Sequence, residues 1–357
     1  MKAQVISLLV LAIIAPSLLA ADPPKFRLAY VEAYKFWSYD EHYQAFQKAL
    51  ADLGWADRVE YPPELHFNWQ GDKTRYRERA REILARKDFD LLISLGTETT
   101  LVILEENREF KRPVLGMSIS NPLGAGIIPG PDDSGSPYFT TVNFGELPGP
   151  YMFILFHSLV GFRSLGLMYH DSPAGRSYTY LKDAREVARD RGFKLVEYNR
   201  LSQEESLEEC RTGVRYLLDQ GVEAIFIPNI NCFDTSTNCL KPLYRMIYER
   251  GVATFASEDF DQVRLYALMG LYFSDPASLG RFQAGQAAAI LSGTPPGQVP
   301  MITNFNSRLL LNLAAAESLK KHGRLNLKIG PEVLALSDRL HLTLPGLDRP
   351  CPAPSHE

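Results

Sequence analysis

The chain has 357 residues, with 38 Lys and Arg against 42 Asp and Glu, so its formal net charge is -4 at pH 7. A mildly acidic chain without a basic cluster does not offer the positive surface that nucleic acid requires, and we expect no nucleic-acid partner. The length also exceeds what one hydrophobic core usually fills, so we expect two lobes.

The N-terminus has the layout of a secretory signal peptide. Met1-Lys2 is a short positive start, Val5 to Ala15 is almost entirely apolar, and Leu18 to Ala21 supplies small residues for cleavage. The apolar run is too short for a membrane span, which needs about 20 residues. We therefore expect residues 1–21 to be a cleavable signal peptide and the mature chain to be periplasmic. An uncleaved N-terminal anchor is the alternative.

Apolar runs rich in β-forming residues then alternate with amphipathic segments. Phe26 to Val31 reads as a strand, and the next apolar residues, Tyr43, Phe46 and Leu50, recur at helical spacing. Leu91 to Leu95 is apolar enough to be covered on both faces, as in parallel sheets. Further strands are expected at 65–67 and 114–118, with helices from Asp72 and from Thr99 to Glu106.

The segment from Gly124 to Pro137 is rich in Gly, Pro, Asp and Ser, so we expect a loop, after which the alternation restarts. The expected strands are 165–169, 194–198, 224–227, 253–256, 265–271 and 301–305, and the expected helices are 177–191, 207–220, 240–249, 279–291 and 309–321. Two such blocks predict an α/β fold with two Rossmann-like lobes, each a parallel sheet wrapped in helices. Ligands of such sheets bind at the carboxyl ends of the strands.

The sequence contains no motif that indicates catalysis. The loop after the first strand is bulky and lacks the Gly-x-Gly-x-x-Gly of a dinucleotide site. Gly116 to Ser120 lacks the last Gly of a hydrolase nucleophile elbow. His170 lies beside Asp171 and Ser172, but adjacency along the chain is not the geometry of a triad. We expect no enzyme, no cofactor and no metal, and a hydrolase is the less favoured alternative.

The cysteines are Cys210, Cys232, Cys239 and Cys351. Cys232 and Cys239 bracket a short polar loop, which in an oxidising compartment predicts a local disulfide. A metal pair is the alternative, although no His or Cys lies at a suitable spacing nearby. Cys210 falls on an apolar helical stripe and is expected to be a buried free thiol, whereas Cys351 lies in the Pro-rich tail.

Candidate ligand-binding residues follow the expected strands. Tyr34 and Trp37 offer aromatic faces on which a flat or cationic ligand can stack, although packing between loop and helix is the alternative. Gly96, Thr97 and Glu98 precede a helix whose N-terminal amides can bind an anionic group such as a carboxylate, unless they form a plain N-cap. The remaining candidates are Ser120, Asn121, Asn229, Asn231, Ser257 and Glu258. Glu258 or its neighbour Asp259 would meet a ligand amine, and the alternative is that both are solvated.

Five segments carry a recognisable pattern in a fixed order: Ser94 to Thr100, Pro113 to Ile127, Ala224 to Asn229, Gly251 to Asp259 and Ala267 to Gly285. Together they resemble the ABC transporter substrate-binding family that includes tryptophan- and tyrosine-binding lipoproteins, from about Lys25 to His341. The resemblance implies the type I periplasmic binding protein fold, in which three crossings join the two lobes. They are expected near Asn143 to Pro148, Ser257 to Gln262 and Gln298 to Asn304.

The implied N-terminal lobe comprises residues 25–143 with 258–297. The C-terminal lobe comprises 144–257 with 298–345, and a Pro-rich tail covers 346–357. The chain departs from the family at Ser120-Asn121-Pro122, where relatives often have Thr-Asp-Pro or Ser-Asp-Pro. A carboxylate for a cationic group is thus missing, so the resemblance does not identify the ligand.

These features predict a monomer that closes on a small molecule, an amino acid or a small aromatic or heterocyclic solute, and presents it to the permease of an ABC importer. The alternative is a periplasmic ligand sensor that docks on a membrane receptor or histidine kinase.

Overall fold

The computed structural model describes residues 25–144, 148–202, 205–234, 240–257, 260–272, 275–302, 308–321 and 337–340. The expected signal peptide at 1–21 and the tail at 346–357 lie outside these residues, as do Cys239, Cys351 and Glu258. None of the helices formed by the described residues combines the length and the apolar character needed to cross a membrane.

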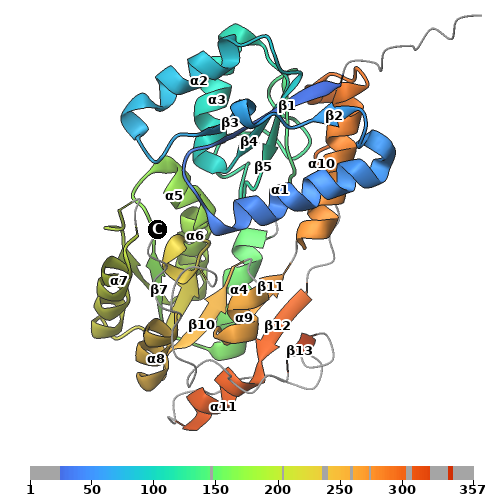
Figure 1. Cartoon of the computed structure of the whole chain (residues 1–357). Coiled ribbons are helices and arrows are strands. Elements are labelled where there is room, and N and C mark those ends of the chain that lie inside the picture. The colour runs from blue at the N-terminus through green and yellow to red at the C-terminus, as the bar shows by residue number, and fades with distance from the viewer. Residues whose placement is uncertain are drawn as a thin grey trace, which may run out of the picture.

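A parallel sheet forms the centre of the N-terminal lobe, at the top of Figure 1. Its strand order is β2-β1-β4-β5-β6, and β3 also pairs with β1. The strands are β1 (Phe26–Glu32), β2 (Val59–Glu60), β3 (His66–Asn68), β4 (Leu91–Leu95), β5 (Val114–Met117) and β6 (Phe139–Thr140). Every residue of β4 is buried, which agrees with the expectation of a strand covered on both faces.

Helices cover both faces of this sheet because its strands alternate their side chains between two apolar cores. Leu28 and Tyr30 pack with α1 (Trp37–Leu50) and α10 (Pro276–Leu291), which lie side by side. Ala29 and Val31 point the other way and pack with α2 (Tyr76–Ala85) and α3 (Thr97–Phe110). Short helices η1 (Ala51–Trp55), η2 (Pro63–Leu65) and η3 (Lys73–Arg75) connect the elements.

The C-terminal lobe contains the larger sheet, with strand order β13-β12-β11-β10-β9-β7-β8. Its pairings are parallel except for β11 with β12. The strands are β7 (Ser164–Met168), β8 (Lys194–Tyr198), β9 (Ala224–Ile227), β10 (Ala253–Ala256), β11 (Met269–Tyr272), β12 (Arg308–Asn312) and β13 (Ser337–Leu340). The helices are α4 (Pro148–Val160), α5 (Pro173–Tyr178), α6 (Leu181–Arg191), α7 (Leu207–Asp219), α8 (Lys241–Glu249), α9 (Phe260–Leu265) and α11 (Leu313–Lys321), with short η4 (Asn231–Phe233) and η5 (Pro296–Gln298).

The chain passes between the lobes at three places: between β6 and α4, between β11 and α10, and between η5 and β12. The number of crossings agrees with the prediction. The first and third crossings run beside each other. Asn143 and Ile302 form an isolated parallel bridge, and the Asn143 N–H donates to the Met301 carbonyl at 2.9 Å. The predicted fold class, two α/β lobes with mostly parallel sheets, is confirmed.

Two details differ from the sequence prediction. The second crossing follows β11 instead of lying near Ser257 to Gln262, because Met269 of β11 pairs with Phe255 of β10 in the larger sheet. The expected segment 258–297 is therefore divided, with residues 260–272 on the C-terminal lobe and α10 on the N-terminal lobe. Leu309, expected to begin a helix, lies in β12, where antiparallel pairing with β11 decides the conformation.

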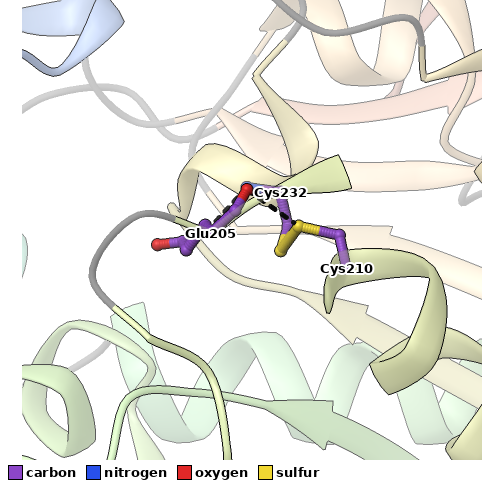
Figure 2. A group of neighbouring side chains, drawn as sticks. All are labelled: Glu205, Cys210 and Cys232. Carbon is purple, nitrogen blue, oxygen red and sulfur yellow. Dashed lines mark hydrogen bonds between the residues drawn. A yellow bond between two sulfur atoms is a disulfide. The ribbon is translucent and has the colours of Figure 1, made fainter. Parts of the chain in front are cut away.

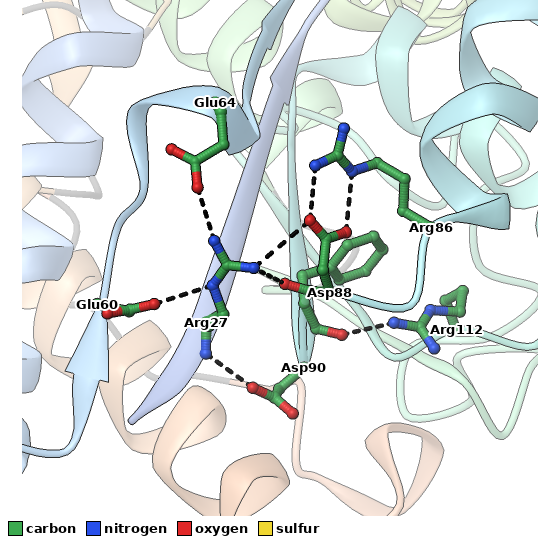
Figure 3. A network of polar contacts seen from close by, with 8 residues as sticks. Arg27, Glu60, Glu64, Arg86, Asp88, Asp90 and Arg112 are labelled. Carbon is green, nitrogen blue, oxygen red and sulfur yellow. Dashed lines mark hydrogen bonds and ion pairs between the residues drawn. The ribbon is translucent and has the colours of Figure 1, made fainter. Parts of the chain in front are cut away.

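A network of charges fixes the start of β1 to the neighbouring loops (Figure 3). The guanidinium of Arg27 pairs with Glu60 at 2.9 Å, Glu64 at 2.7 Å and Asp88 at 3.4 Å, and Asp88 also pairs with Arg86 at 2.6 Å. These residues lie around the amino end of β1, the edge opposite to the expected ligand site, so we interpret the network as structural.

Candidate functional site

A cleft lies between the two lobes at the carboxyl ends of the strands of the N-terminal sheet. The loops after β1, β4 and β5 form one side together with α10, and residues of α5 and of the turn after β9 form the other. Its volume is about 50 Å³, which is room for a few water molecules. The lining residues are Tyr34, Phe36, Ser38, Tyr39, His42, Thr97, Glu98, Ser118, Ile119, Ser120, Thr141, Val142, Phe144, Tyr178, Asn229, Leu279 and Gln283.

Five of the residues predicted from the sequence line this cleft: Tyr34, Thr97, Glu98, Ser120 and Asn229. Four of them come from the N-terminal lobe and Asn229 comes from the C-terminal lobe, directly after β9. The carboxyl ends of the strands therefore bring these positions together, as parallel topology requires.

Other predicted residues are not among the cleft-lining residues. Asn121 uses its Oδ1 to accept the Gly124 N–H at 2.8 Å and thereby holds the turn after β5. Ser257 donates its backbone N–H to Ile227 at 3.0 Å, and Asn231 belongs to η4 behind Asn229. Trp37 is the first residue of α1, but its side chain lies outside the described part of the structure, as does Glu258.

Gly96 is not among the cleft-lining residues, and the structure shows why glycine stands there. Its φ is +83°, and a Cβ at this position would overlap the hydroxyl of Tyr39. Only glycine therefore allows Tyr39 to lie against the turn between β4 and α3. The space beside the Gly96 Cα is therefore filled by a side chain of the protein.

Aromatic side chains form one wall of the cleft. The Tyr34 and Tyr39 ring centroids are 6.3 Å apart, and their hydroxyls are hydrogen-bonded to each other. Burial raises the pKa of Tyr34 and of Tyr178 well above its ordinary value, and the nearby carboxylates Glu98 and Glu205 raise it further. These tyrosines are therefore neutral at physiological pH and keep hydroxyls that can donate hydrogen bonds.

The charges around the cleft are balanced. The Glu98 carboxylate pairs with Lys73 Nζ at 2.8 Å. His42 is held by a hydrogen bond between its Nδ1 and Ser118 Oγ at 2.8 Å, and burial lowers its pKa to about 4, so the ring is neutral near pH 7. Among the described cleft-lining residues there is no Lys or Arg.

Two side-chain amides reach the cleft from opposite lobes. Gln283 of α10 is 1% exposed and Asn229 follows β9. Within the described part of the chain, neither Gln283 Oε1 nor Asn229 Oδ1 has a hydrogen-bond partner, although both atoms are buried. Buried polar atoms are nearly always paired, so these two amides point to a partner that binds from the cleft.

The turn behind Asn229 is fixed by a disulfide (Figure 2). Cys232 of η4 is bonded to Cys210 of α7, with a Cα–Cα distance of 5.4 Å. The predicted pair Cys232–Cys239 is therefore wrong, and Cys210 is not a free thiol. The sequence favoured the short loop, but the fold places the start of α7 against η4, and proximity in space decides which cysteines pair.

Glu205 completes this arrangement from the loop before α7. Its Oε2 accepts the Cys232 N–H at 2.7 Å, and its Oε1 is hydrogen-bonded to His170 Nε2 at 2.5 Å. Glu205, Cys210 and Cys232 lie close enough for a metal, but thiolates are the metal ligands and both sulfurs are in the disulfide. These residues therefore hold η4 in place through the disulfide and the hydrogen bond to the Cys232 N–H.

Sequence reasoning missed several lining residues. Tyr178 ends a short helix whose apolar pattern gave no sign of the cleft, and Gln283 lies within a helix that reads as ordinary core. His42 lies on α1 beyond the aromatic loop. Their contribution depends on the approach of the other lobe, which local patterns do not encode.

Two α/β lobes joined by three crossings, with a cleft lined from both lobes, define the fold of a type I periplasmic binding protein. A family model described as ABC transporter substrate binding protein matches residues 35–324. The chain belongs to this family, which confirms the resemblance inferred from the sequence. No curated protein matches the chain.

Solved structures share this fold at low sequence identity. An ABC domain in complex with L-Trp from Streptococcus pneumoniae is 18% identical, with a TM-score of 0.70 over 88% of this chain and 99% of that one. A conserved domain protein from Vibrio cholerae is 19% identical, with the same TM-score and coverage. A 5-methylthioribose transporter solute binding protein from Thermotoga lettingae, in complex with 5-methylthioribose, is 13% identical, with a TM-score of 0.57 over 87% and 95%.

Proposed function

We propose that this chain is an exported solute-binding protein that closes on one small molecule, an amino acid or a small aromatic or heterocyclic solute, and presents it to an ABC importer. Residues 1–21 act as its signal peptide, and the mature protein works as a monomer in the periplasm. The observation that carries the proposal is the cleft, because side chains from both lobes line it.

Closure follows from this arrangement. A ligand that contacts both lobes stabilises only the closed state, so binding shifts the population toward closure. Among the described residues, two hydrogen bonds join the loop after β5 to α5 and the residues that follow it. The Tyr180 hydroxyl donates to the Ser120 carbonyl at 3.0 Å, and Ser177 Oγ donates to the Asn121 carbonyl at 3.1 Å. The bound ligand then supplies further contacts that join the two lobes.

The proposed protein does no chemistry on its ligand. His42 and Ser118 lie at the distance of a base and a nucleophile, but a histidine whose pKa is about 4 is a weak base. No carboxylate within the described residues is hydrogen-bonded to His42, so the ring lacks the orienting group of a triad. Release of nitrophenol from p-nitrophenyl acetate, abolished by Ser118→Ala, would contradict this reasoning.

The ligand class is proposed from the cleft and not from the structural neighbours. These neighbours are described with different ligands, L-Trp in one case and 5-methylthioribose in another. The test is native mass spectrometry of the purified mature protein, followed by thermal-shift measurements with amino acids, nucleobases and sugars. A ligand at a hundredfold excess over its Kd raises the free energy of unfolding by about 2.7 kcal/mol.

The matched variants are Tyr34→Ala, which removes a wall of the cleft, and Tyr151→Ala, which removes a tyrosine that is 48% exposed on α4. We expect the first to weaken binding of any hit about tenfold or more, since loss of a buried aromatic anchor costs upward of 1 kcal/mol, and the second to leave it unchanged. A protein that carries no ligand and responds to no compound of the three classes contradicts the proposed function.

A further inference from the structure

The side chain of Gln283 is placed for recognition of a ligand. It is 1% exposed, it lines the cleft, and its Oε1 has no partner within the described part of the chain. Gln286, three residues further along α10, also has a buried Oε1 without a partner among the described residues, but its Nε2 serves the structure. Its Nε2 donates to the carbonyls of Thr141 at 2.8 Å and Pro300 at 2.9 Å, and it does not line the cleft. For Gln283, no hydrogen bond of its Oε1 is found among the described residues, and its side chain lines the cleft.

A primary amide offers a donor and an acceptor side by side. Its natural complement is an edge on which an N–H stands next to a carbonyl or a ring nitrogen, as when Asn or Gln binds the edge of adenine. Asn229 brings a second unpaired amide oxygen from the C-terminal lobe. A ligand with such edges would pair with both lobes at once.

The walls of the cleft suit a flat molecule. Tyr34, Phe36, Tyr39, Phe144 and Tyr178 contribute aromatic surface, and stacking on aromatic rings favours planar π-systems.

The charges disfavour an amino acid. A zwitterion needs a cation for its carboxylate and an anion for its ammonium, because unpaired buried charges are costly. No Lys or Arg is found among the described cleft-lining residues, and Glu98 is already paired with Lys73. Asn121 provides no carboxylate for an ammonium.

We infer that the ligand is a small, planar, uncharged heterocycle with a hydrogen-bond donor and acceptor on adjacent ring atoms, recognised by the amides of Gln283 and Asn229 from opposite lobes. This inference rests on the proposed function and narrows its ligand class.

The experiment uses the purified mature protein and isothermal titration with defined probes. Uracil and xanthine carry a ring N–H next to a carbonyl. Their N-methylated counterparts, dimethyluracil and caffeine, lack this N–H. L-tryptophan, L-tyrosine and L-leucine represent zwitterions, and glucose represents sugars. We expect binding of uracil or xanthine, at least about tenfold weaker binding of the methylated counterpart, as loss of a paired donor implies, and no binding of the amino acids.

Gln283→Met tests the role of the amide at nearly constant volume. We expect affinity for the bound base to fall about tenfold to a hundredfold, the cost of one bidentate contact. The melting temperature of the ligand-free protein should stay equal or rise, because an unpaired buried amide is removed. Gln44→Met, at an exposed position of α1, should change neither quantity. A purely structural glutamine would lower the melting temperature instead.

The outcomes separate this inference from the proposed function. Binding of an amino acid or of glucose without binding of either base overturns the heterocycle and leaves the solute-binding function standing. Equal affinity of wild type and Gln283→Met for a bound base overturns the role of the amide. If no probe of any class binds, both the inference and the proposed function fail.

Discussion

Replacing Cys210 and Cys232 together by alanine removes the covalent link between α7 and η4. The two cysteines are separated by 22 residues in sequence, and the chain-entropy model gives a loop of this length about 3 kcal/mol of stabilisation through restriction of the unfolded chain. Both residues are fully buried, so alanine avoids the added cost of burying a hydroxyl. We expect the free energy of unfolding of the double variant to fall by about 3 kcal/mol.

Denaturant unfolding followed by circular dichroism measures this change. Reductant should destabilise the wild type by a similar amount and should leave the double variant unaffected, while Cys351→Ala serves as the matched single-cysteine control. Peptide mapping without reduction should recover a peptide containing Cys210 linked to one containing Cys232. Recovery of Cys232 linked to Cys239, or equal stability of the oxidised and reduced wild type, would refute the reasoning.

Two further predictions concern the cleft. Folding lowers the pKa of His42 from 6.5 to about 4. As the pH falls, the unfolded chain therefore binds a proton at His42 before the folded protein does. The folded state accordingly loses stability between about pH 6.5 and pH 4. The stability advantage of wild type over His42→Gln should shrink by about 2 kcal/mol between pH 7 and about pH 4.5, measured by urea unfolding, and a pH-independent difference would contradict the shift. Gly96→Ala should lower the free energy of unfolding by more than about 2 kcal/mol, because the added Cβ overlaps Tyr39. Gly54 has a similar φ of +84° but open space around it, so Gly54→Ala should lower it by about 1 kcal/mol. Equal melting temperatures of the two variants would argue against the overlap.

The alternation of strands and helices could be predicted from the sequence because each element carries its own periodicity. Leu91 to Leu95 is an uninterrupted apolar run, and every one of these residues is buried in a central strand. The second crossing could not be placed in the same way. Met269 pairs with Phe255 of the larger sheet, and the sheet that a short apolar strand joins depends on contacts that lie far away in the sequence.

The candidate site was predictable where it follows from sheet topology. Tyr34, Thr97 and Ser120 come directly after strands, and their strands end at one edge. Gln283 and Tyr178 are side chains of helices, and they reach the cleft only because the lobes face each other. The predicted disulfide partner was wrong for a related reason. Short separation favoured Cys239 for Cys232, but the fold brings Cys210 to within bonding distance.

The same long-range contacts that escaped prediction give the cleft one rigid side. Cys232 is held through its sulfur by Cys210 and through its N–H by Glu205, and η4 therefore keeps the turn that carries Asn229 in place. A binding group that is ordered before the ligand arrives loses less entropy on binding. The amide of Asn229 is thus positioned by the C-terminal lobe alone, whereas in the proposed closure Gln283 would arrive with α10. Recognition of the two edges of a ligand would then be divided between a fixed lobe and a closing one, which makes closure itself part of the selectivity.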